Sequence, residues 1–505
     1  MSTQQPEVRT YSHWLRPQTS GLGKLSWPVT MVLLGGLVVS FLLYFVHVFV
    51  TLGGMVVTGL IVWALATKDR DGTSIVERAG ERYTWWGIRS AKSNLYRSGP
   101  LSRLPWGTHQ LPGLAASTKL YEFHDSADRP FGLIYMPSTG HFAVVIGTQP
   151  DGAALVDQEQ VDAWVANWGG WLAGLVDEPG LVQATVTVET APDSPFRLQQ
   201  KVEAAIDEQA PLFAQQVMRE VVVRYPEASA RTAAYVTLTF EGVKLLPGRR
   251  KRELEEVGDA LANRLVWITA GLEATGAGWA APMPAAELCE VVRVAHDPAA
   301  SSLVDSIHAE GGETDLTWDS VGPAAHEAGW DYYRHDGALS KTWTMSVAPR
   351  GVVRERVLAR LLAPNAKVQR KRVTLRYRPI DPGVAAELVD SEVNDAQSAT
   401  RSPNAGTYAG LRLDSARQTA AEEASGAALV LFGMSVTATV TDPESWDQLD
   451  GVIASLTKSA RLRLRPAYGA QDSAFAGTLP LGIVPMLHNA ATKGYGATIQ
   501  RVVGQ

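Results

Sequence analysis

Two arginine-rich stretches contain the residue types best suited to binding chemistry in this sequence. In KVQRKRVTLRYRP (367–379), period-two alternation would turn Val373, Leu375 and Tyr377 inward and leave arginines on the outer face of one strand. KSARLRLRP (458–466) repeats the arrangement. A solvated sheet face is the alternative interpretation. The spacing otherwise predicts a positive patch for an acidic partner or for nucleic acid, single-stranded DNA included, formed by Arg372, Arg376, Arg378, Arg461, Arg463 and Arg465.

The motifs of common enzyme classes are missing from the sequence. The phosphate-loop pattern G-x-x-x-x-G-K-[ST] has no match, because GLGKLS (21–26) lacks the spacing, and no G-x-S-x-G nucleophile elbow is present. HEAGW, beginning at His326, lacks the second histidine of a zinc-binding helix, and HDP (296–298) is typical of a helix end and turn. The ten histidines show no ligand spacing. We therefore expect no catalytic residues, no metal and no cofactor.

Charge and cysteine content narrow the class of protein. The chain of 505 residues has a net charge of −6, but residues 1–106 contain eleven Lys/Arg against five Asp/Glu. The remaining residues are therefore acidic overall, and the chain has no global nucleic-acid footprint. Its one cysteine, Cys289, lies in AAELCEVV, the pattern of an apolar helix face, which predicts inert packing in a reducing compartment.

A segment near the amino terminus has the composition of a membrane anchor. Residues 28–67 contain no charged side chain. One helix of about forty residues would be about 60 Å long, against a hydrocarbon core of about 30 Å. We therefore predict a transmembrane helical hairpin, with helices near 28–46 and 51–66. Basic residues flank both sides of the hairpin, which places both termini in the cytoplasm, with the protein in the plasma membrane and 1–27 as a cytoplasmic tail.

Two features near this segment leave alternatives open. His47, the one ionisable group in the apolar run, is either an interfacial histidine near the turn or an intramembrane proton relay. The following stretch, 68–112, interleaves aromatic and basic residues, which suits the lipid headgroup layer. A linker helix that docks on the soluble body is the other interpretation. The predicted membrane-interface residues are Trp85, Trp86, Arg89 and Lys92.

Beyond residue 107, strand-like and helix-like patterns alternate, which predicts an α+β fold. We expect strands near 131–136, 141–148, 181–189, 233–240, 342–347, 373–378, 434–441 and 461–466. Helices are expected near 158–176, 197–223, 250–273, 287–294, 350–362, 412–428 and 443–459, with a mobile polar excursion at 390–410. The order predicts two sandwich-like halves of related topology, at 113–296 and 336–482, separated by a loop or insertion at 297–335 and followed by a tail at 483–505.

The carboxyl-terminal stretch QDSAFAGTLPLG resembles a signature, Q-x-x-A-F-x-x-x-L-P-x-G, at the end of the amino-terminal domain of conjugative type IV secretion ATPases. The predicted hairpin resembles the small inner-membrane subunit of the same machines. The whole chain resembles actinobacterial integral membrane proteins of integrative conjugative elements, which join that hairpin to the non-catalytic half of the ATPase. The matching signature positions are Gln471, Ala474, Phe475, Leu479, Pro480 and Gly482.

The resemblance implies a structural subunit of a DNA-transfer apparatus. Only twenty-three residues follow Gly482 and none forms a Walker sequence, so ATP hydrolysis is not carried over. We expect the signature to dock a separate P-loop ATPase. The other expected partners are further membrane subunits and the phospholipid bilayer, within an oligomeric assembly.

Two other function classes remain open at this stage. A type VII secretion membrane component also has two amino-terminal spans before a cytoplasmic domain, so topology alone does not separate the two machines. Neighbouring genes would, because a relaxase and a P-loop protein favour conjugation, whereas small helical secreted proteins favour type VII secretion. A membrane-bound enzyme is the third class, and turnover by the isolated chain would reveal it.

Overall fold

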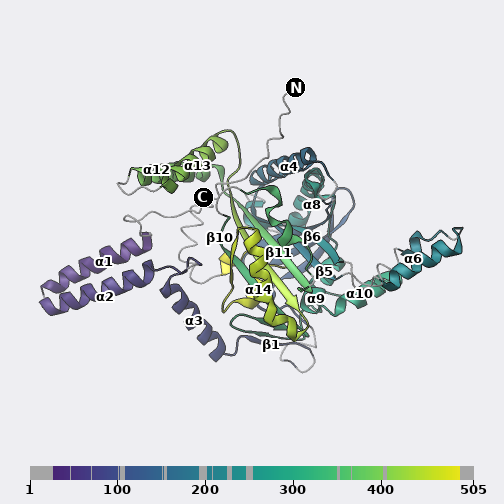
Figure 1. The fold of residues 1–505 in the computed structure, drawn as a ribbon, viewed down its shortest axis with the longest axis horizontal. Coiled ribbons are helices and arrows are strands. Elements are labelled where there is room, and N and C mark those ends of the chain that lie inside the picture. The colour runs from purple at the N-terminus through teal and green to yellow at the C-terminus, as the bar shows by residue number, and fades with distance from the viewer. Residues whose placement is uncertain are drawn as a thin grey trace.

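The computed structural model describes residues 27–488, except 46, 70, 100–101, 103–108, 151, 153–155, 193–201, 208, 225–229, 246–253, 350–352, 366 and 402–406. All of the predicted tail at 1–27 except Trp27, and most of 483–505, therefore lie outside the described residues. Figure 1 shows a mixed helix and sheet body from which several helices project. The predicted α+β class is confirmed.

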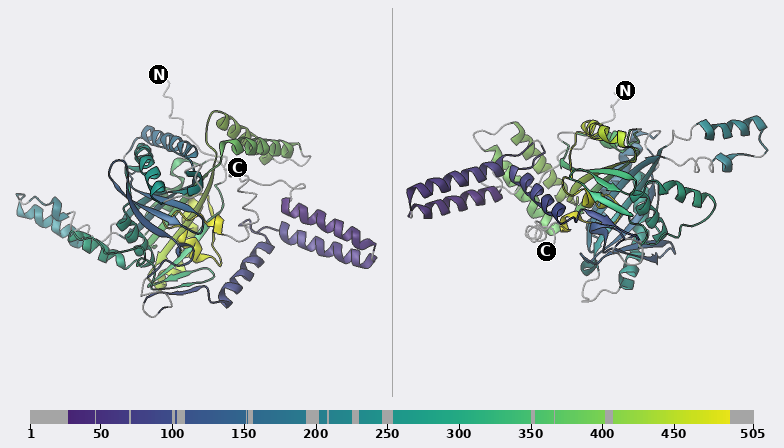
Figure 2. Two further views of the ribbon diagram at one scale, coloured as in Figure 1. Left: turned by 180° about the vertical axis from the view of Figure 1, so that it is seen from behind. Right: turned by 90° about the horizontal axis from the view of Figure 1, so that it is seen from below.

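Two apolar helices, α1 (Trp27–Tyr44) and α2 (Val48–Ala66), lie side by side and antiparallel, outside the body (Figures 1 and 2). His47 caps α2, since its Nδ1 accepts a hydrogen bond from the Phe49 N–H at 3.3 Å. Glycine permits the close approach, because a Cβ on Gly36 would lie 2.2 Å from the Thr58 side chain. In the part of the chain that the structure describes, one helix, Val48–Ala66, is long and apolar enough to cross a membrane, and the apolar stretch of α1 is shorter.

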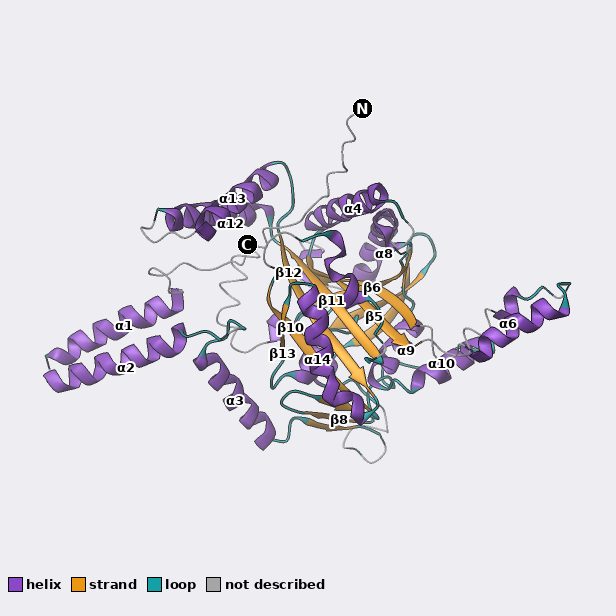
Figure 3. Ribbon diagram, viewed as in Figure 1, coloured by secondary structure: helices purple, strands orange, loops and turns teal. Residues whose placement is uncertain are grey.

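One antiparallel sheet of thirteen strands runs through the described part of the body (Figure 3). Its strand order is β1-β8-β9-β10-β12-β11-β5-β6-β4-β3-β2, with β13 beside β10 and β7 beside β4. The strands are β1 (Leu95–Arg97), β2 (Lys119–His124), β3 (Pro130–Met136), β4 (His141–Gln149), β5 (Leu181–Pro192), β6 (Ala230–Glu241), β7 (Trp279–Pro282), β8 (Ala325–Ala328), β9 (Tyr333–His335), β10 (Ala338–Val347), β11 (Arg370–Pro379), β12 (Val430–Val440) and β13 (Arg463–Pro466).

The remaining helices connect or cover these strands. The α-helices are α3 (Ile75–Ser90), α4 (Gln158–Val176), α6 (Leu212–Arg224), α7 (Gly242–Leu245), α8 (Leu254–Leu272), α9 (Ala285–His296), α10 (Ala300–Ala309), α11 (Ala359–Leu362), α12 (Pro382–Thr400), α13 (Thr407–Ala424), α14 (Pro443–Ser459) and α15 (Gln471–Ala476). Short helical turns complete the fold at η2 (Gly113–Ala115), η3 (Glu273–Ala277), η4 (Glu355–Leu358) and η5 (Pro485–His488).

The two predicted halves share this sheet instead of forming separate sandwiches. In the first half, β4, β6 and β5 are neighbours, and in the second half β10, β12 and β11 occupy the corresponding places. In each half a helix, α8 or α14, leads to a short strand, β7 or β13, that pairs with β4 or β10. The halves meet where β5 pairs with β11, with Thr187 opposite Thr374. The arrangement has approximate twofold symmetry about this pair.

The two faces of the sheet differ in composition. One face is apolar, and it packs Leu238, Phe240 and other side chains against α4 and α8 in the first half. Val436 and its neighbours pack against α14 in the second half. The other face, which we call the threonine face, is buried although much of it is hydroxylic, and its members include Thr185, Thr187, Thr237, Thr239, Thr342, Thr374, Thr437 and Thr439.

Several predicted boundaries need correction. The predicted loop at 297–335 contains α10, β8 and β9. The polar excursion at 390–410 is helical as far as Thr400, because α12 is capped by Asp381 and buries Ala385, Val389 and Ala396 at helical spacing, and it is helical again from Thr407, where α13 begins. The helix expected at 350–362 is limited to η4 and α11. Part of the helix expected at 197–223 lies outside the described residues, and the rest includes α6. By contrast, α4 and α14 have the predicted bounds.

Candidate functional site

The carboxyl-terminal segment, residues 471–484, lies on the threonine face and is largely buried there. The Gln471 side chain makes two hydrogen bonds to the backbone of Thr342, at 2.8 and 3.2 Å. Thr478 Oγ1 lies 2.9 Å from Thr437 Oγ1, and the Thr239 hydroxyl donates to the Gly482 carbonyl at 3.0 Å. These bonds satisfy hydroxyl groups that would be costly to bury unpaired. The segment is therefore a structural cover of the sheet.

This position changes the interpretation of the six signature residues. Gln471, Phe475, Leu479, Pro480 and Gly482 are buried, and Ala474 is half-buried. Phe475, Leu479 and their apolar neighbours pack with α9 and the first half of the sheet in one core cluster. Buried side chains do not present a surface to a second protein. In this conformation the signature therefore supports the sheet and does not form a docking face.

The three arginines of β11 are not on an outer face, which corrects the predicted patch. Arg372 is fully buried, with its guanidinium 4.6 Å from the centre of the Phe475 ring. Arg376 donates to the Gly477 carbonyl at 2.6 Å and to the Ser435 hydroxyl at 2.7 Å. Arg378 Nη1 lies 3.1 Å from the Met486 sulfur. The alternation was predicted correctly, but both faces of β11 are covered, a fact that period-two spacing does not encode.

Burial changes the charge properties of these arginines. It lowers the pKa of Arg372 and of Arg376 to about 10. Both groups still carry their charge near neutral pH. Within the described residues, none of the three guanidinium nitrogens of Arg372 has a hydrogen-bond partner. Its positive charge is stabilised by a cation–π contact with Phe475 and by the negative charge of Glu189 on the neighbouring strand.

The arginines of the second stretch lie elsewhere. Arg461 and Arg463 are exposed. Arg465 donates two hydrogen bonds to the Glu81 carboxylate of α3, at 2.6 and 2.9 Å. This ion pair raises the pKa of Arg465. The six arginines therefore do not form one patch, and the exposed part of the prediction is reduced to Arg461 and Arg463 at the start of β13.

The predicted membrane-interface residues divide between two faces of α3. Trp85 lies against Trp330 of the body, with ring centres 6.1 Å apart. Trp86, Arg89 and Lys92 are exposed. α3 therefore docks on the body through Trp85 and leaves Trp86 and Arg89 exposed, and Lys92 lies just beyond the end of the helix.

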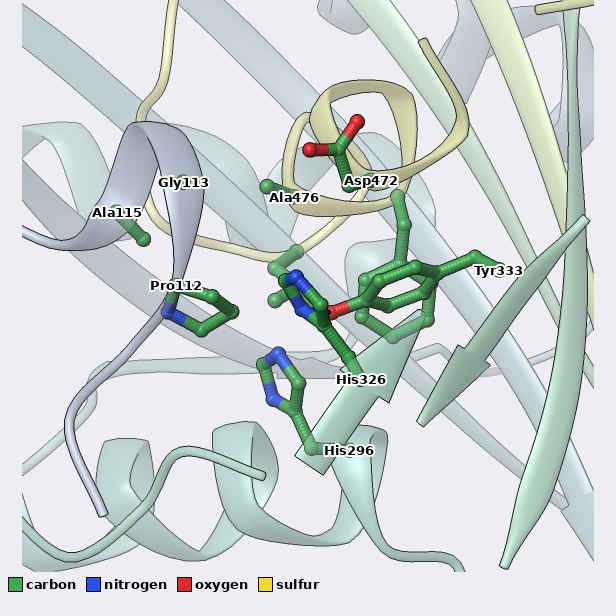
Figure 4. Close-up of a pocket in the computed structure, with 10 residues that line it drawn as sticks. Pro112, Gly113, Ala115, His296, His326, Tyr333, Asp472 and Ala476 are labelled. Carbon is green, nitrogen blue, oxygen red and sulfur yellow. Dashed lines mark hydrogen bonds between the residues drawn. The ribbon is translucent and has the colours of Figure 1, made fainter. Parts of the chain in front are cut away.

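His296 and His326 line a small cavity beneath α15 (Figure 4). The ring centre of a third histidine, His335, lies 6.1 Å from that of His296. His326 Nδ1 lies 2.8 Å from the Tyr333 hydroxyl, and His296 Nδ1 lies 3.0 Å from the Val292 carbonyl. His335 bonds to the His296 carbonyl and, through Nε2, to the Ser340 hydroxyl at 2.7 Å. Burial lowers the pKa of His296 to about 3 and that of His326 to about 4, and it lowers the pKa of His335 strongly.

These histidines are neutral hydrogen-bonding groups that join α9, β8, β9 and β10. His296 is the last residue of α9, as the HDP pattern predicted, and His326 lies on a strand and not on a zinc-binding helix. Asp472, whose pKa is raised by burial, also lines the cavity. No group of three or more potential metal ligands is present among the described residues. The packing predicted for Cys289 agrees with its burial, which raises the pKa of the thiol to about 12.

Sequence reasoning predicted a helix over 197–223 but did not predict the exposure of its apolar residues. α6 joins β5 to β6 and projects from the end of the molecule opposite to α1 and α2 (Figures 1 and 2). Leu212 and Phe213 are 82% and 78% exposed, and Val217 and Met218 are also exposed. The apolar character of these residues is visible in the sequence, but the sequence does not show that they are exposed. The signal that such a helix stands apart from the body lies in tertiary structure only.

The comparisons with known proteins cover a small part of the chain. Residues 18–77 match a family described as a domain of unknown function, DUF8461. This region includes α1, α2 and the first residues of α3. No curated protein matches the sequence.

The contact between Gly482 and the threonine face leads to a stability prediction. Gly482 has a φ of +70°, and a Cβ there would lie 2.3 Å from Ala143 Cβ. Gly482→Ala should destabilise the protein by roughly 2–5 kcal/mol, the sum of backbone strain and overpacking. Thermal unfolding in detergent measures the effect. Gly140→Ala is the control, because Gly140 has a φ of +71° with open space around it, and it should cost about 1–2 kcal/mol. Equal losses would show that the segment does not press on the sheet.

The neutral histidines lead to a prediction about pH. Unfolded histidine has a pKa of about 6.5, so between pH 6.5 and about 3 the unfolded state binds a proton that native His296 does not. The contribution of neutral His296 to the free energy of unfolding is therefore complete above pH 6.5. It falls on acidification by roughly 1 kcal/mol per pH unit until the pH reaches the native pKa. His296→Asn should flatten the dependence of the urea midpoint on pH between 6.5 and 4. Buried Asp472 acts in the opposite direction but is common to both proteins. Parallel curves would contradict the assignment.

Proposed function

We propose that the chain is a non-catalytic, membrane-anchored structural subunit of a conjugative, type IV secretion-like DNA-transfer apparatus, and that it holds a separate P-loop ATPase at the cytoplasmic face. The observation that carries the proposal is the pair of exposed apolar helices, α1 and α2, attached to an α+β body. The choice of a conjugative machine rests on two resemblances to its components, that of the carboxyl-terminal signature and that of the order of hairpin and body.

The properties of α1 and α2 support the membrane anchor. With 18 and 19 residues, the helices are about 27 and 28 Å long, close to the thickness of a hydrocarbon core. Large apolar side chains such as Phe41, Phe49 and Val57 are exposed on them, which water would disfavour and lipid would not. Basic residues on both sides of the pair favour a cytoplasmic location for both ends, and hence two spans in the plasma membrane.

The exposed residues of α6 offer a docking surface for the ATPase. Because the signature residues are buried, they are unsuitable for this role without rearrangement. Leu212 and Phe213 instead lie at the end of the molecule away from α1 and α2, where a soluble cytoplasmic partner would be accessible. Adjacent apolar side chains of this size are typical anchors of a protein interface.

Type VII secretion remains the second candidate, because two spans followed by a cytoplasmic body fit both machines. The signature favours conjugation. The identity of the captured ATPase and of its gene neighbours separates the two, since a relaxase gene belongs with conjugation and genes for small helical secreted proteins belong with type VII secretion.

Replacing Leu212 and Phe213 together by glutamate tests the docking surface. A P-loop ATPase should co-purify with the wild-type chain from detergent-solubilised membranes of the source organism. The double variant should recover roughly tenfold less of it, because charges replace two apolar anchors.

Leu411→Glu is the matched control for this experiment. Leu411 is 59% exposed on α13, so a glutamate replaces an exposed apolar side chain on a distant surface, and ATPase recovery should not change. Undiminished recovery with the double variant would exclude α6 as the docking surface. A wild-type chain purified with no ATPase would contradict the proposed function itself.

A further inference from the structure

Helix α3 packs against the body with one side and leaves another side exposed. The first side docks on the body, where Glu81 forms the ion pair with Arg465, Trp85 packs on Trp330, and the Arg82 guanidinium lies 5.4 Å from the centre of the Trp330 ring. The Arg465 and Glu81 side chains are both largely shielded from solvent, so this contact is more than a loose surface pair. The body therefore fixes which side of α3 faces outward.

The outward side is apolar and, among the residues that the structure describes, nothing covers it. Val76, Tyr83 and Trp86 recur at seven- and three-residue spacing, which places them on one stripe of the helix. Tyr83 is 75% exposed and Trp86 is 68% exposed. Beside the stripe, at nearly the same angle around the helix axis as Val76, Gly80 and Gly87 have open space where a side chain would project. Two large aromatic rings on an uncovered stripe indicate a surface built for a partner.

The charges around the stripe favour an anionic partner. Every charged residue from Arg82 to Arg103 is basic. Arg89 and Lys92 are exposed beside the aromatic stripe. Tyrosine and tryptophan next to basic side chains are the residues that favour the boundary between headgroups and acyl chains.

The position of α3 restricts which anionic surface it can reach. It begins nine residues after the end of α2, and the connection folds back on itself through a bridge between Lys68 and Ser74. The Asp69 N–H also bonds to the Thr73 carbonyl at 2.9 Å, and Arg78 pairs with Asp69 at 3.2 Å. A capping box between Ser74 and Glu77 fixes the first turn. The start of α3 therefore stays close to the end of α2.

We propose that α3 lies in the headgroup layer of the same bilayer that α2 enters, with Val76, Tyr83 and Trp86 toward the acyl chains and Arg89 and Lys92 toward lipid phosphates. This inference rests on the membrane anchor of the proposed function. The docked side of α3 then holds the body against the cytoplasmic surface of the membrane in a fixed orientation. α3 thus contacts the lipid on one side and the body on the other, and it fixes their relative orientation.

A site-directed fluorescence experiment tests this arrangement. The chain has one cysteine, which is buried, so the wild-type protein should take up little thiol-reactive dye. Tyr83→Cys and Trp86→Cys are labelled in the full-length protein and reconstituted into vesicles of phosphatidylglycerol and phosphatidylcholine. Val57→Cys on α2 reports the anchor, and Leu303→Cys, 62% exposed on α10 at the far end of the body, reports a site away from lipid.

Phosphatidylcholine with a nitroxide quencher near the headgroup should quench the labels at positions 83 and 86 several-fold more than the label at 303. A quencher deep in the acyl chains should act most strongly at 57. If 57 is quenched but 83 and 86 behave like 303, the α3 proposal fails while the anchor stands. If 57 is not quenched either, both fail. If the labels at 83 and 86 are shielded from the lipid-borne quencher, and this shielding appears only at a high protein-to-lipid ratio, a second copy of the chain covers this face. That result also overturns the proposal.

Discussion

The pairing of β5 with β11 is the interaction on which the rest of the structure depends. Thr187 and Thr374 face each other at its centre, 3.0 Å apart between their hydroxyl oxygens, and the pairing extends from Ala184 with Tyr377 to Thr190 with Lys371. Without it, each half would expose a long edge strand, which is a site for aggregation. With this pairing, the two halves form one continuous sheet. α6 projects from the end of the first half, and α12 and α13 project from the end of the second half.

The threonine face follows from this arrangement. β-branched side chains suit central strands, but their hydroxyl groups need partners when they are covered. The carboxyl-terminal segment supplies several of these partners by spanning both halves, since Gly482 bonds to Thr239 in the first and Thr478 to Thr437 in the second. The carboxyl-terminal segment therefore joins the two halves by covering this face of the sheet. The same cover buries Arg372 and partly buries Arg376, so binding surfaces are left to the projecting helices and to the exposed Arg461 and Arg463.

Local signals predicted local structure well. α14 begins at Pro443 after the cap at Asp442, and α4 has the bounds that its pattern indicated. The alternation of β11 was also correct. What covers each face was not predictable, because Arg376 finds its partner at Gly477, a hundred residues away, and no period in the sequence records that contact. The exposure of Leu212 and the docking of Trp85 on Trp330 depend on tertiary structure in the same way.

Hydrogen exchange of the full-length protein in detergent, followed by mass spectrometry, tests the joined sheet most directly. Peptides from β5 and β11 should exchange as slowly as those from β6 and β12, because all four are interior strands of one sheet, and much more slowly than the edge strand β2. If β5 and β11 exchanged as fast as β2 while β6 and β12 stayed protected, the halves would be separate domains and would not share one continuous sheet.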